Sequence, residues 1–353
     1  MKILVTGAAG LLGSRFVDWI LENKPTAQIV GLDDLSGGYV ENTPKNHPRY
    51  TFVMMDAADS RVGELFEKNS FDYVVHFAAY AAECVSPFIR KFNYNNNLIA
   101  TANLINFSIK YGIKRFLFTS SMAVYGGNNN PPFSEDLVPY PNDPYGIAKY
   151  ACEMDLRVAG EQHGLDWVIL RPHNVYGQKQ NLWDSYRNVI GIWMWKHMNG
   201  LPLSIYGDGE QKRAFSYIND SLEPMWTALV DLKTSKQIIN IGGIHEYSIN
   251  ETAKTLVEVM GGGEIKYFPP RHEVKYAWST WDKSVDLLGF AHKTSLFDGM
   301  MDMWLWAQAQ PHRSRFIWSE YEIETGSNLY GCIFYRIICH KFFDLHHKKM
   351  VRY

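Results

Sequence analysis

Tyr145 and Lys149 are the two residues whose types and spacing most clearly suggest chemistry. They lie four positions apart in a stretch that reads as a helix, and residues at that spacing share one helix face. An ammonium group beside a phenol stabilises the phenolate and so lowers a pKa that is ordinarily about 10. The pair therefore predicts a base that works at neutral pH. The alternative is an ordinary Tyr/Lys pair on a solvated helix face, because short motifs often occur by chance.

A glycine-rich loop follows the first apolar stretch of the chain. Residues 2–6 read as a buried strand, Gly7, Gly10 and Gly13 come next, and the spacing of apolar residues after them is helical. In a strand–loop–helix unit, Gly7 permits the tight turn, Gly10 the close approach of a pyrophosphate, and Gly13 the packing of helix on strand. The loop predicts a dinucleotide site. The alternative is a glycine-rich turn without a ligand.

Two aspartates follow the next predicted strands. The strand Gln28–Leu32 ends in Asp33, and the strand Tyr50–Met54 leads to Asp56. A carboxylate about 20 residues beyond the glycine loop can bind both hydroxyls of an adenosine ribose and repels a 2′-phosphate. Asp33 therefore favours NAD over NADP, and Asp56 can reach the adenine amino group.

The alternation of strands and helices continues to about residue 170. A helix over Val62–Lys68 precedes a strand over Asp72–Phe77, and a long helix containing Asn95, Asn96 and Asn97 precedes the strand Arg115–Thr119. The sixth strand covers Trp167–Leu170. This order predicts the α/β class, with a doubly wound parallel sheet whose ligands bind at the carboxyl ends of the strands. Asp33, Asp56, Ala78, Ser120 and Ser121 all fall at such ends, so we expect them to line one crevice.

Composition narrows the class of protein. The chain has 353 residues, of which 46% are hydrophobic and 20% charged, and its formal net charge is −2. These values are typical of a globular protein and give no electrostatic reason to expect a nucleic-acid partner. The four cysteines fit no disulfide framework, the N-terminus leads directly into a strand pattern, and no apolar run is long enough to span a bilayer. We expect a soluble, cytoplasmic protein with no firm membrane association.

The last part of the chain is less regular. Residues 331–353 mix apolar and basic side chains, which is typical of an amphipathic helix that touches a membrane surface or partner. A docked or poorly ordered terminal extension is the interpretation we favour. The spacing of Cys332, Cys339, His340, His346 and His347 fits no compact metal site, so no metal is expected.

Several motifs, taken together and in order, resemble one family of enzymes. The sequence resembles the extended short-chain dehydrogenase/reductases, and within them the nucleotide-sugar epimerases and dehydratases, over about residues 1–310. The matching segments are Thr6–Gly13, Asp33–Ser36, His76–Ala79, Ser120–Ser121 with Tyr125–Gly126, Tyr145–Lys149, Arg171–Gly177, Asn188, Tyr206–Arg213 and Arg271.

The resemblance implies a Rossmann-type sheet that holds NAD tightly and a catalytic set of Ser121, Tyr145 and Lys149. Cofactor contacts are expected from Gly7, Gly10, Leu11, Leu12, Gly13, Asp33, Asp34, Asp56, Ala57, Phe77, Ala78, Ala79, Asn96, Ser120, Tyr145, Lys149 and Pro172. Substrate contacts are expected from Ser121, Met122, Tyr145, Asn174, Asn188, Val189, Arg213 and Arg271. Arginines and amide donors suit the diphosphate of a nucleotide sugar.

The expected domain organisation is discontinuous in sequence. We assign residues 1–172 and about 215–245 to the NAD-binding domain, and about 173–214 with 246–310 to a smaller, C-terminal, nucleotide-sugar-binding domain. Residues 311–353 form an extension whose role the sequence leaves open.

The residues after Ser121 discriminate between reactions. In the 4,6-dehydratases that these motifs also resemble, two polar or acidic residues follow the hydroxyl residue, whereas this chain has Met122 and Ala123. Neither side chain can transfer a proton. A 4-epimerase needs one acid/base, so the hypothesis is NAD-dependent 4-epimerisation of a UDP-hexose of the glucose/galactose type. The alternatives are a nucleotide-sugar dehydratase, decarboxylase or reductase, and a dinucleotide-binding sensor or scaffold without turnover.

The identity of the sugar and the oligomeric state are open at this level. Tyr80, Met122 and Trp183 are candidate pocket residues that no motif places. The resemblance implies a homodimer through the helices around Leu98–Lys110 and Tyr145–Gln162. Apolar residues there include Leu98, Leu104, Ile105, Met154 and Leu156.

Overall fold

A seven-stranded sheet forms the centre of the computed structural model, which describes residues 1–271, 273–318 and 321–323. The strand order is β11-β6-β5-β4-β1-β2-β3, and every neighbouring pair is parallel. The strands are β1 Lys2–Thr6, β2 Gln28–Asp33, β3 Tyr50–Met54, β4 Tyr73–His76, β5 Arg115–Thr119, β6 Trp167–Pro172 and β11 Gln237–Ile241. The predicted α/β class with a doubly wound parallel sheet is confirmed.

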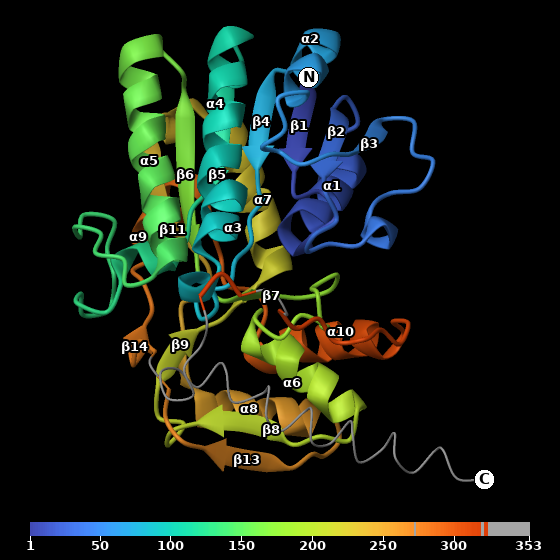
Figure 1. Cartoon of the computed structure of the whole chain (residues 1–353), viewed down its shortest axis with the longest axis vertical. Coiled ribbons are helices and arrows are strands. Elements are labelled where there is room, and N and C mark those ends of the chain that lie inside the picture. Colours follow the sequence, from blue (N-terminus) through green and yellow to red (C-terminus); the bar gives the residue numbers. More distant parts are fainter. Residues whose placement is uncertain (272, 319–320, 324–353) are drawn as a thin grey trace.

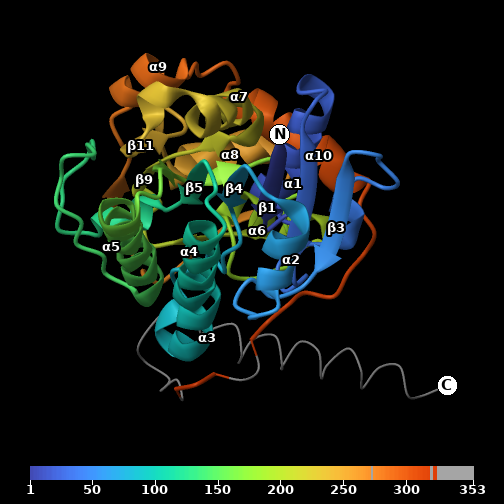
Figure 2. The same cartoon turned by 90° about the horizontal axis from the view of Figure 1, so that it is seen from above.

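Helices cover both faces of this sheet (Figure 1, Figure 2). Those on one face are α1 Leu11–Asn23, α7 Ile218–Val230 and α9 Asp282–Leu288, and those on the other are α2 Val62–Asn69, α4 Ala100–Lys110 and α5 Pro144–His163. Alternate residues of each strand enter opposite cores: Ile3 and Val5 pack on the first face and Leu4 on the second. Because both faces are buried, the strands are continuously apolar rather than alternating.

The long helix predicted around Asn95 to Asn97 contains an irregular turn. It consists of α3 Arg90–Tyr94, a π-helical turn η3 Asn95–Ile99, and α4. Such turns are rare and occur often at functional sites. The remaining short helices are η1 Val40–Asn42, η2 Ser86–Phe88, η4 Met122–Tyr125 and η5 Leu232–Thr234.

The start of α5 is fixed by its own sequence. Asp143 caps the helix, and its Oδ1 accepts hydrogen bonds from the backbone N–H of Tyr145 at 2.9 Å and of Gly146 at 3.0 Å. Pro144 occupies the first helical position, where its missing N–H costs nothing. The cap therefore sets Tyr145 in the first turn, at the edge where the sheet strands end.

A smaller lobe lies beyond the carboxyl ends of the strands (Figure 1). Its strands pair as β7 with β10, β9 with β12 and β14, and β8 with β13, and its core contains Trp193, Met300 and Met303. The elements are β7 Val175–Tyr176, α6 Val189–Met198, β8 Leu203–Tyr206, β9 Lys212–Ala214, β10 Ser216–Tyr217, β12 Glu246–Ser248, α8 Ile249–Val259, β13 Ile265–Phe268, β14 Tyr276–Ala277 and α10 Leu296–Gln308.

The predictions for residues 331–353, including the cysteines and histidines there, lie outside the described residues. Over the described ranges, no helix combines the length and the apolar character needed to cross a membrane. The same ranges contain no group of three or more His, Cys, Asp or Glu side chains arranged to hold a metal ion.

Candidate active site and cofactor cleft

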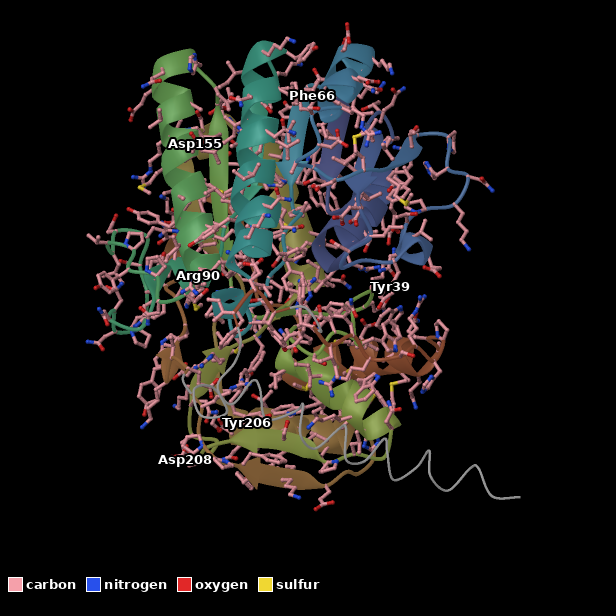
Figure 3. All side chains as sticks on the ribbon, in the orientation of Figure 1. Tyr39, Phe66, Arg90, Asp155, Tyr206 and Asp208 are labelled. Carbon is pink, nitrogen blue, oxygen red and sulfur yellow. The ribbon has the colours of Figure 1, made fainter. Side chains whose placement is uncertain are left out.

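One large cavity lies between the carboxyl ends of the sheet strands and the smaller lobe. Its volume is about 660 Å³, within the usual range for small-molecule sites. In Figure 3, Tyr39 lies at the level where the two lobes meet and Tyr206 lies in the smaller lobe. The structure brings every residue predicted to bind cofactor or substrate to the wall of this cavity. They are Gly7, Gly10, Leu11, Leu12, Gly13, Asp33, Asp34, Asp56, Ala57, Phe77, Ala78, Ala79, Asn96, Ser120, Ser121, Met122, Tyr145, Lys149, Pro172, Asn174, Asn188, Val189, Arg213 and Arg271.

The glycine loop fits a dinucleotide. A Cβ at Gly7 would lie 2.7 Å from the nitrogen of Ala78, and one at Gly13 would lie 2.1 Å from the oxygen of Gly7, so the fold itself requires these two glycines. A Cβ at Gly10 would meet nothing closer than the Gly7 oxygen at 3.4 Å. The space beside Gly10 is therefore open to the cavity. No side chain caps the N-terminus of α1 there, which is where a phosphate binds well.

Asp33 is held rigidly at the end of β2. Its Oδ2 accepts from the N–H of Ala9 at 2.9 Å and its Oδ1 from the N–H of Leu35 at 2.8 Å. Burial raises the pKa of this carboxyl above its ordinary value, and the two hydrogen bonds oppose that shift. Asp56 is fixed in the same way by the N–H of Ala58 at 2.8 Å, whereas Asp34 closes a turn through Ser36.

Tyr145 and Lys149 are both buried in the wall of the cavity, at 6% and 2% exposure. Burial raises the pKa of the Tyr145 phenol above its ordinary value, the Glu83 carboxylate raises it further, and a hydrogen bond from the Ser121 side chain lowers it. The lowering expected from Lys149 stays a prediction, since Lys149 is not among the main groups that shift this pKa. The Lys149 ammonium lies 5.9 Å from the centre of the Tyr145 ring and donates to the carbonyl of Thr119 at 2.7 Å.

Lys149 is itself strongly affected by its surroundings. Burial lowers the pKa of its ammonium to about 8, although Cys152 and Glu153 oppose the shift. A lysine with a pKa near neutrality can give up or regain a proton during a reaction. Burial therefore moves the two pKa values apart, because it raises that of the Tyr145 phenol and lowers that of the Lys149 ammonium.

Ser121 and its neighbours form the wall next to the phenol. The Ser121 side chain lowers the pKa of the Tyr145 phenol, and its Oγ accepts from the N–H of Ala123 at 3.1 Å. Met122 and Ala123 both line the cavity, and Met122 packs against Val124 and Phe133. The two side chains after Ser121 therefore present only apolar atoms to a substrate.

A buried polar network stands behind this wall. The hydroxyl of Ser120 donates to Glu153 at 2.5 Å, and Glu153 pairs with Arg171 through contacts of 2.6 and 2.9 Å. Arg171 also donates to the hydroxyl of Tyr125 at 2.8 Å, which in turn donates to Asn240 at 2.7 Å. The hydroxyl of Ser120 thus connects the end of β5 to α5 through Glu153, although Ser120 also lines the cavity.

Glu83 is a residue of the cavity that the sequence reasoning missed. It follows β4 in a run of small residues, and its side chain is exposed to the cavity. Burial, helped by the nearby charge of Asp143, raises the pKa of the Glu83 carboxyl to about 8. A carboxyl of this kind can exchange a proton near neutral pH. The one available signal was a lone acidic residue among alanines after a strand end.

The amides expected to grip a diphosphate are already bonded to the backbone. Asn174 donates to the carbonyl of Ala214 at 2.8 Å, and Asn188 caps α6 and donates to the carbonyl of Val175 at 3.1 Å. The arginines are different. Arg213 and Arg271 both line the cavity and face Glu273 at 3.8 and 3.3 Å. They supply the positive charge at the smaller-lobe end.

Sequence reasoning also missed Gln180, Arg187 and two residues near the C-terminus, Arg315 and Ile317, all of which line the cavity. Gln180 is buried, and neither atom of its amide has a hydrogen-bond partner in the part of the chain that the structure describes. Of the three pocket candidates that no motif could place, only Met122 borders the cavity. Tyr80 is covered by the guanidinium of Arg187 at 4.4 Å and Trp183 by that of Arg313 at 5.3 Å, each measured to the ring centre.

Comparisons with known proteins agree with this site. Residues 3–242 match the model of the NAD dependent epimerase/dehydratase family. The crystal structure of a UDP-glucose 4-epimerase with UDP-glucose from Thermotoga maritima is similar to this chain, with a TM-score of 0.81 and 33% identity over 87% of this chain and 99% of that one.

Similar proteins carry more than one activity. A UDP-glucuronic acid 4-epimerase from Bacillus cereus, solved with UDP-glucuronic acid and NAD, gives a TM-score of 0.80 at 29% identity over 87% of this chain and 99% of that one. The dTDP-D-glucose 4,6-dehydratase of Homo sapiens is 32% identical over 264 residues, 73% of this chain and 74% of its own length. With the glycine cradle, Asp33 and the Ser121–Tyr145–Lys149 wall in one cavity, the chain belongs to the NAD-dependent epimerase/dehydratase family and is an NAD-dependent enzyme.

Proposed function

We propose that the protein epimerises a UDP-hexose at C4, between the glucose and galactose configurations, through a transient 4-keto sugar. The observation that best supports this is the wall around Tyr145. Ser121 and Tyr145 line the same cavity, the Ser121 side chain lowers the pKa of the phenol, and the next two residues, Met122 and Ala123, bring no proton donor or acceptor. A 4-epimerase requires one acid/base at C4, and Tyr145 supplies it.

In the proposed reaction Tyr145 takes the proton of the sugar's 4-hydroxyl and later returns it to the 4-keto oxygen. Ser121 hydrogen-bonds the same oxygen, and Lys149 exchanges a proton with its surroundings as the charge on the phenol changes. Gly10 and Asp33 would hold the dinucleotide, which would supply the hydride acceptor and donor for C4. Turning the keto sugar over before the hydride returns inverts the configuration.

The rest of the cavity is assigned by charge. We propose that Gly10 and Asp33 hold the dinucleotide and that Arg213 and Arg271 hold the diphosphate of the nucleotide sugar. The domain boundaries proposed above follow this division, with residues 1–172 and about 215–245 on the cofactor side and about 173–214 with 246–310 on the sugar side.

The direct test is incubation with UDP-galactose, with the appearance of UDP-glucose followed by proton NMR. We expect interconversion without net consumption of NAD. A panel that includes UDP-N-acetylhexosamines and UDP-uronic acids identifies the preferred sugar. If no UDP-sugar is interconverted by protein that contains NAD, the proposal is wrong.

Glu83 supports a second candidate, 4,6-dehydration. Elimination of water across C5 and C6 needs a further acid/base, and the Glu83 carboxyl shares the cavity with Tyr145 and acts on its pKa. The similarity to a dTDP-D-glucose 4,6-dehydratase agrees with this alternative. The same NMR experiment with UDP-glucose and dTDP-glucose separates the two, because a dehydratase accumulates a 4-keto-6-deoxy product.

A further inference from the structure

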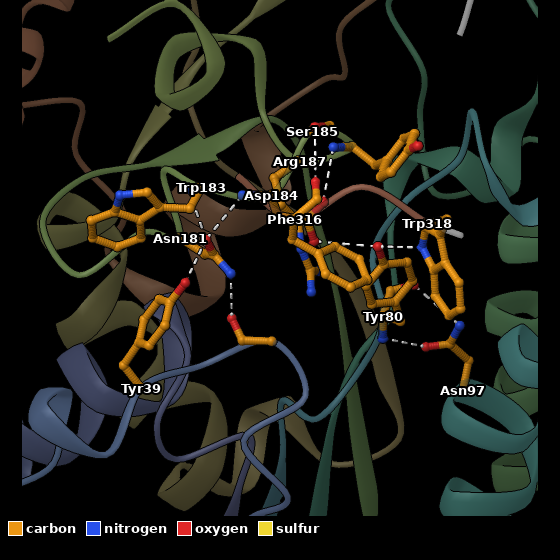
Figure 4. Close-up of polar contacts among 12 residues, drawn as sticks. Tyr39, Tyr80, Asn97, Asn181, Trp183, Asp184, Ser185, Arg187, Phe316 and Trp318 are labelled. Carbon is orange, nitrogen blue, oxygen red and sulfur yellow. Dashed lines mark hydrogen bonds and ion pairs between the residues drawn. The ribbon is translucent and has the colours of Figure 1, made fainter. Parts of the chain in front are cut away.

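Residues 311–318 form a C-terminal arm that follows α10 and lies along the opening of the cavity. Phe316 attaches the arm to the smaller lobe: its N–H donates to the carbonyl of Trp183 at 2.8 Å, and its carbonyl accepts from the hydroxyl of Ser185 at 2.9 Å (Figure 4). The residues on either side of it, Arg315 and Ile317, line the cavity. The arm is therefore part of the wall of the site.

The last residue of the arm is connected to the interior by a chain of hydrogen bonds. The indole N–H of Trp318 donates to the hydroxyl of Tyr80 at 2.9 Å, and this hydroxyl donates to Asp184 Oδ2 at 3.3 Å. The same oxygen of Asp184 accepts from Arg187 Nε at 2.9 Å. Figure 4 shows these side chains converging from three segments that are far apart in sequence.

This chain of hydrogen bonds fixes the direction of the Arg187 side chain. Asp184 and Tyr80 are buried at 2% and 3% exposure, and the Arg187 guanidinium stacks 4.4 Å from the centre of the Tyr80 ring. A buried carboxylate needs a partner with good geometry. Within the described residues, the hydrogen bond from Nε to Asp184 is the only one that Arg187 makes. Its two terminal nitrogens are left for a ligand.

The guanidinium lies beside the loop that follows β2 and Asp33. A Cβ at Gly37 would lie 2.5 Å from Arg187 Nη2, and one at Gly38 would lie 2.4 Å from the carbonyl carbon of Ala9, next to Gly10. The charge of Arg187 acts on both Asp33 and Tyr145. The Arg187 charge therefore faces the part of the cavity that Asp33 and Tyr145 also line.

We propose that Arg187 binds a diphosphate in the cavity and that the C-terminal arm, through Trp318, Tyr80 and Asp184, is what holds it there. Two terminal N–H groups of one guanidinium match two phosphate oxygens. Trp318 is a positioning residue that acts through Arg187. The inference rests on the proposed function where the diphosphate belongs to a nucleotide sugar, and on the NAD-dependent family where it belongs to the dinucleotide.

The test compares Trp318→Phe, Arg187→Met and the double variant with the wild type. Trp318→Phe keeps the ring contacts with Phe92 and Phe316, at 4.8 and 5.6 Å between centroids, and removes only the N–H donor. The measurements are UDP affinity by calorimetry, NAD content of the purified protein, and the unfolding temperature. Arg187→Met should weaken one of the two ligands on the order of tenfold, and Trp318→Phe several-fold.

The double variant is the decisive measurement. If Trp318 acts through Arg187, adding Trp318→Phe to Arg187→Met causes no further loss, whereas independent structural effects add. A weaker UDP affinity assigns the contact to the nucleotide sugar, and a lower NAD content assigns it to the dinucleotide. Trp281→Phe, at an exposed tryptophan on α9's N-terminal side, is the matched control and should change neither.

Unchanged binding of both UDP and NAD by Arg187→Met, or additive losses in the double variant, would overturn the inference. A wild type that binds neither probe would overturn it too. Neither readout depends on turnover. A protein that binds UDP and NAD but epimerises no sugar would contradict the proposed function alone.

Discussion

Tyr145 shows how one side chain can be the centre of a site while its surroundings oppose its role. Burial and the Glu83 carboxylate raise the pKa of the phenol, whereas the Ser121 side chain and the charge of Arg187 lower it. A base of this kind works when positive charge comes close to it, which links proton removal to occupation of the cleft. The phenol is therefore protected from ionising outside the reaction.

Tyr145→Phe tests the central assignment. The substitution removes the hydroxyl and keeps the buried ring, so NAD content and the unfolding temperature should match those of the wild type. Epimerisation should fall by about 10³-fold or more, because a positioned general base typically contributes about 10²–10⁴. NMR of UDP-galactose turnover gives the rate, and retained activity would contradict the role of Tyr145.

Glu83→Gln tests the coupling between the carboxyl and the phenol. Because Glu83 is ionised only above about pH 8, its removal should lower the pKa of Tyr145 above that pH, raise the activity there relative to the wild type, and change the profile little below it. Asp136→Asn, at an exposed carboxylate, is the control and should leave the profile in place. An unchanged profile in Glu83→Gln would show that the two groups are not coupled during turnover.

At the scale of the elements, the ion pair of Glu153 and Arg171 joins α5 to β6 behind the catalytic wall. Both side chains are buried, at 0% and 1% exposure. Glu153→Ala leaves the Arg171 charge without its partner, and breaking a buried pair in this way costs about 3–5 kcal/mol of unfolding free energy. Glu161→Ala, on the exposed side of the same helix, should change it by less than about 0.5 kcal/mol. Urea unfolding measures both.

The elements that the sequence predicted well are those whose signals are local. The strand Tyr50–Met54 was predicted at the bounds observed for β3, and the glycine loop needs only its own neighbours. Glu83, Gln180 and Arg187 were missed because their roles depend on residues far away in sequence. Tyr80, Asp184 and Trp318 form one hydrogen-bonded chain, yet 104 positions separate Tyr80 from Asp184 and 238 separate it from Trp318.

Some local predictions were also too simple. The sequence places Lys149 on the same helix face as Tyr145. It does not show that the Lys149 ammonium donates its hydrogen bond to the carbonyl of Thr119. Likewise Asn188 has the right chemistry for a diphosphate, and the same amide chemistry makes it a helix cap. The type of a residue determines which groups its side chain can bond to, and the packing of the fold determines which of these groups is its actual partner.

At the scale of the whole molecule, a buried histidine makes stability depend on pH. Burial lowers the pKa of His173 to about 4, from an ordinary value of about 6.5 in the unfolded chain. The unfolded state therefore binds more protons below pH 6.5, and the contribution of His173 to stability is lost as the pH falls toward 4. Between pH 7.5 and 5 this amounts to about 2 kcal/mol.

His173→Gln measures this contribution. Glutamine can keep a donor for the carbonyl of Gly243, which His173 Nε2 contacts at 2.9 Å, but it cannot be protonated. Between pH 7.5 and 5, the free energy of unfolding of the variant should fall by about 2 kcal/mol less than that of the wild type. His312→Gln, at an exposed histidine, should follow the wild type. Equal pH dependence in all three proteins would contradict the assignment.

The homodimer remains a prediction, but the structure indicates other residues for its interface than the sequence did. Leu104, Ile105 and Leu156 are buried in the core. By contrast, Ile147, Met154 and Val158 are 45%, 45% and 43% exposed on one face of α5. An exposed apolar stripe of this kind suits a partner surface. We expect light scattering to give a dimer mass, and Met154→Glu to shift it toward the monomer. A monomeric wild type would contradict the prediction.

The arm over residues 311–318 has a consequence for the order in which the protein becomes active during synthesis. The glycine loop, the strands and α5 all leave the ribosome before it, and domains fold largely as they emerge. The sheet can therefore form early and begin to hold its dinucleotide while the opening beside Arg187 is still uncovered. Only when Phe316 and Trp318 have been translated can the arm pair with Trp183 and Tyr80. A nascent chain stalled before that point would carry a folded core and an unfinished site.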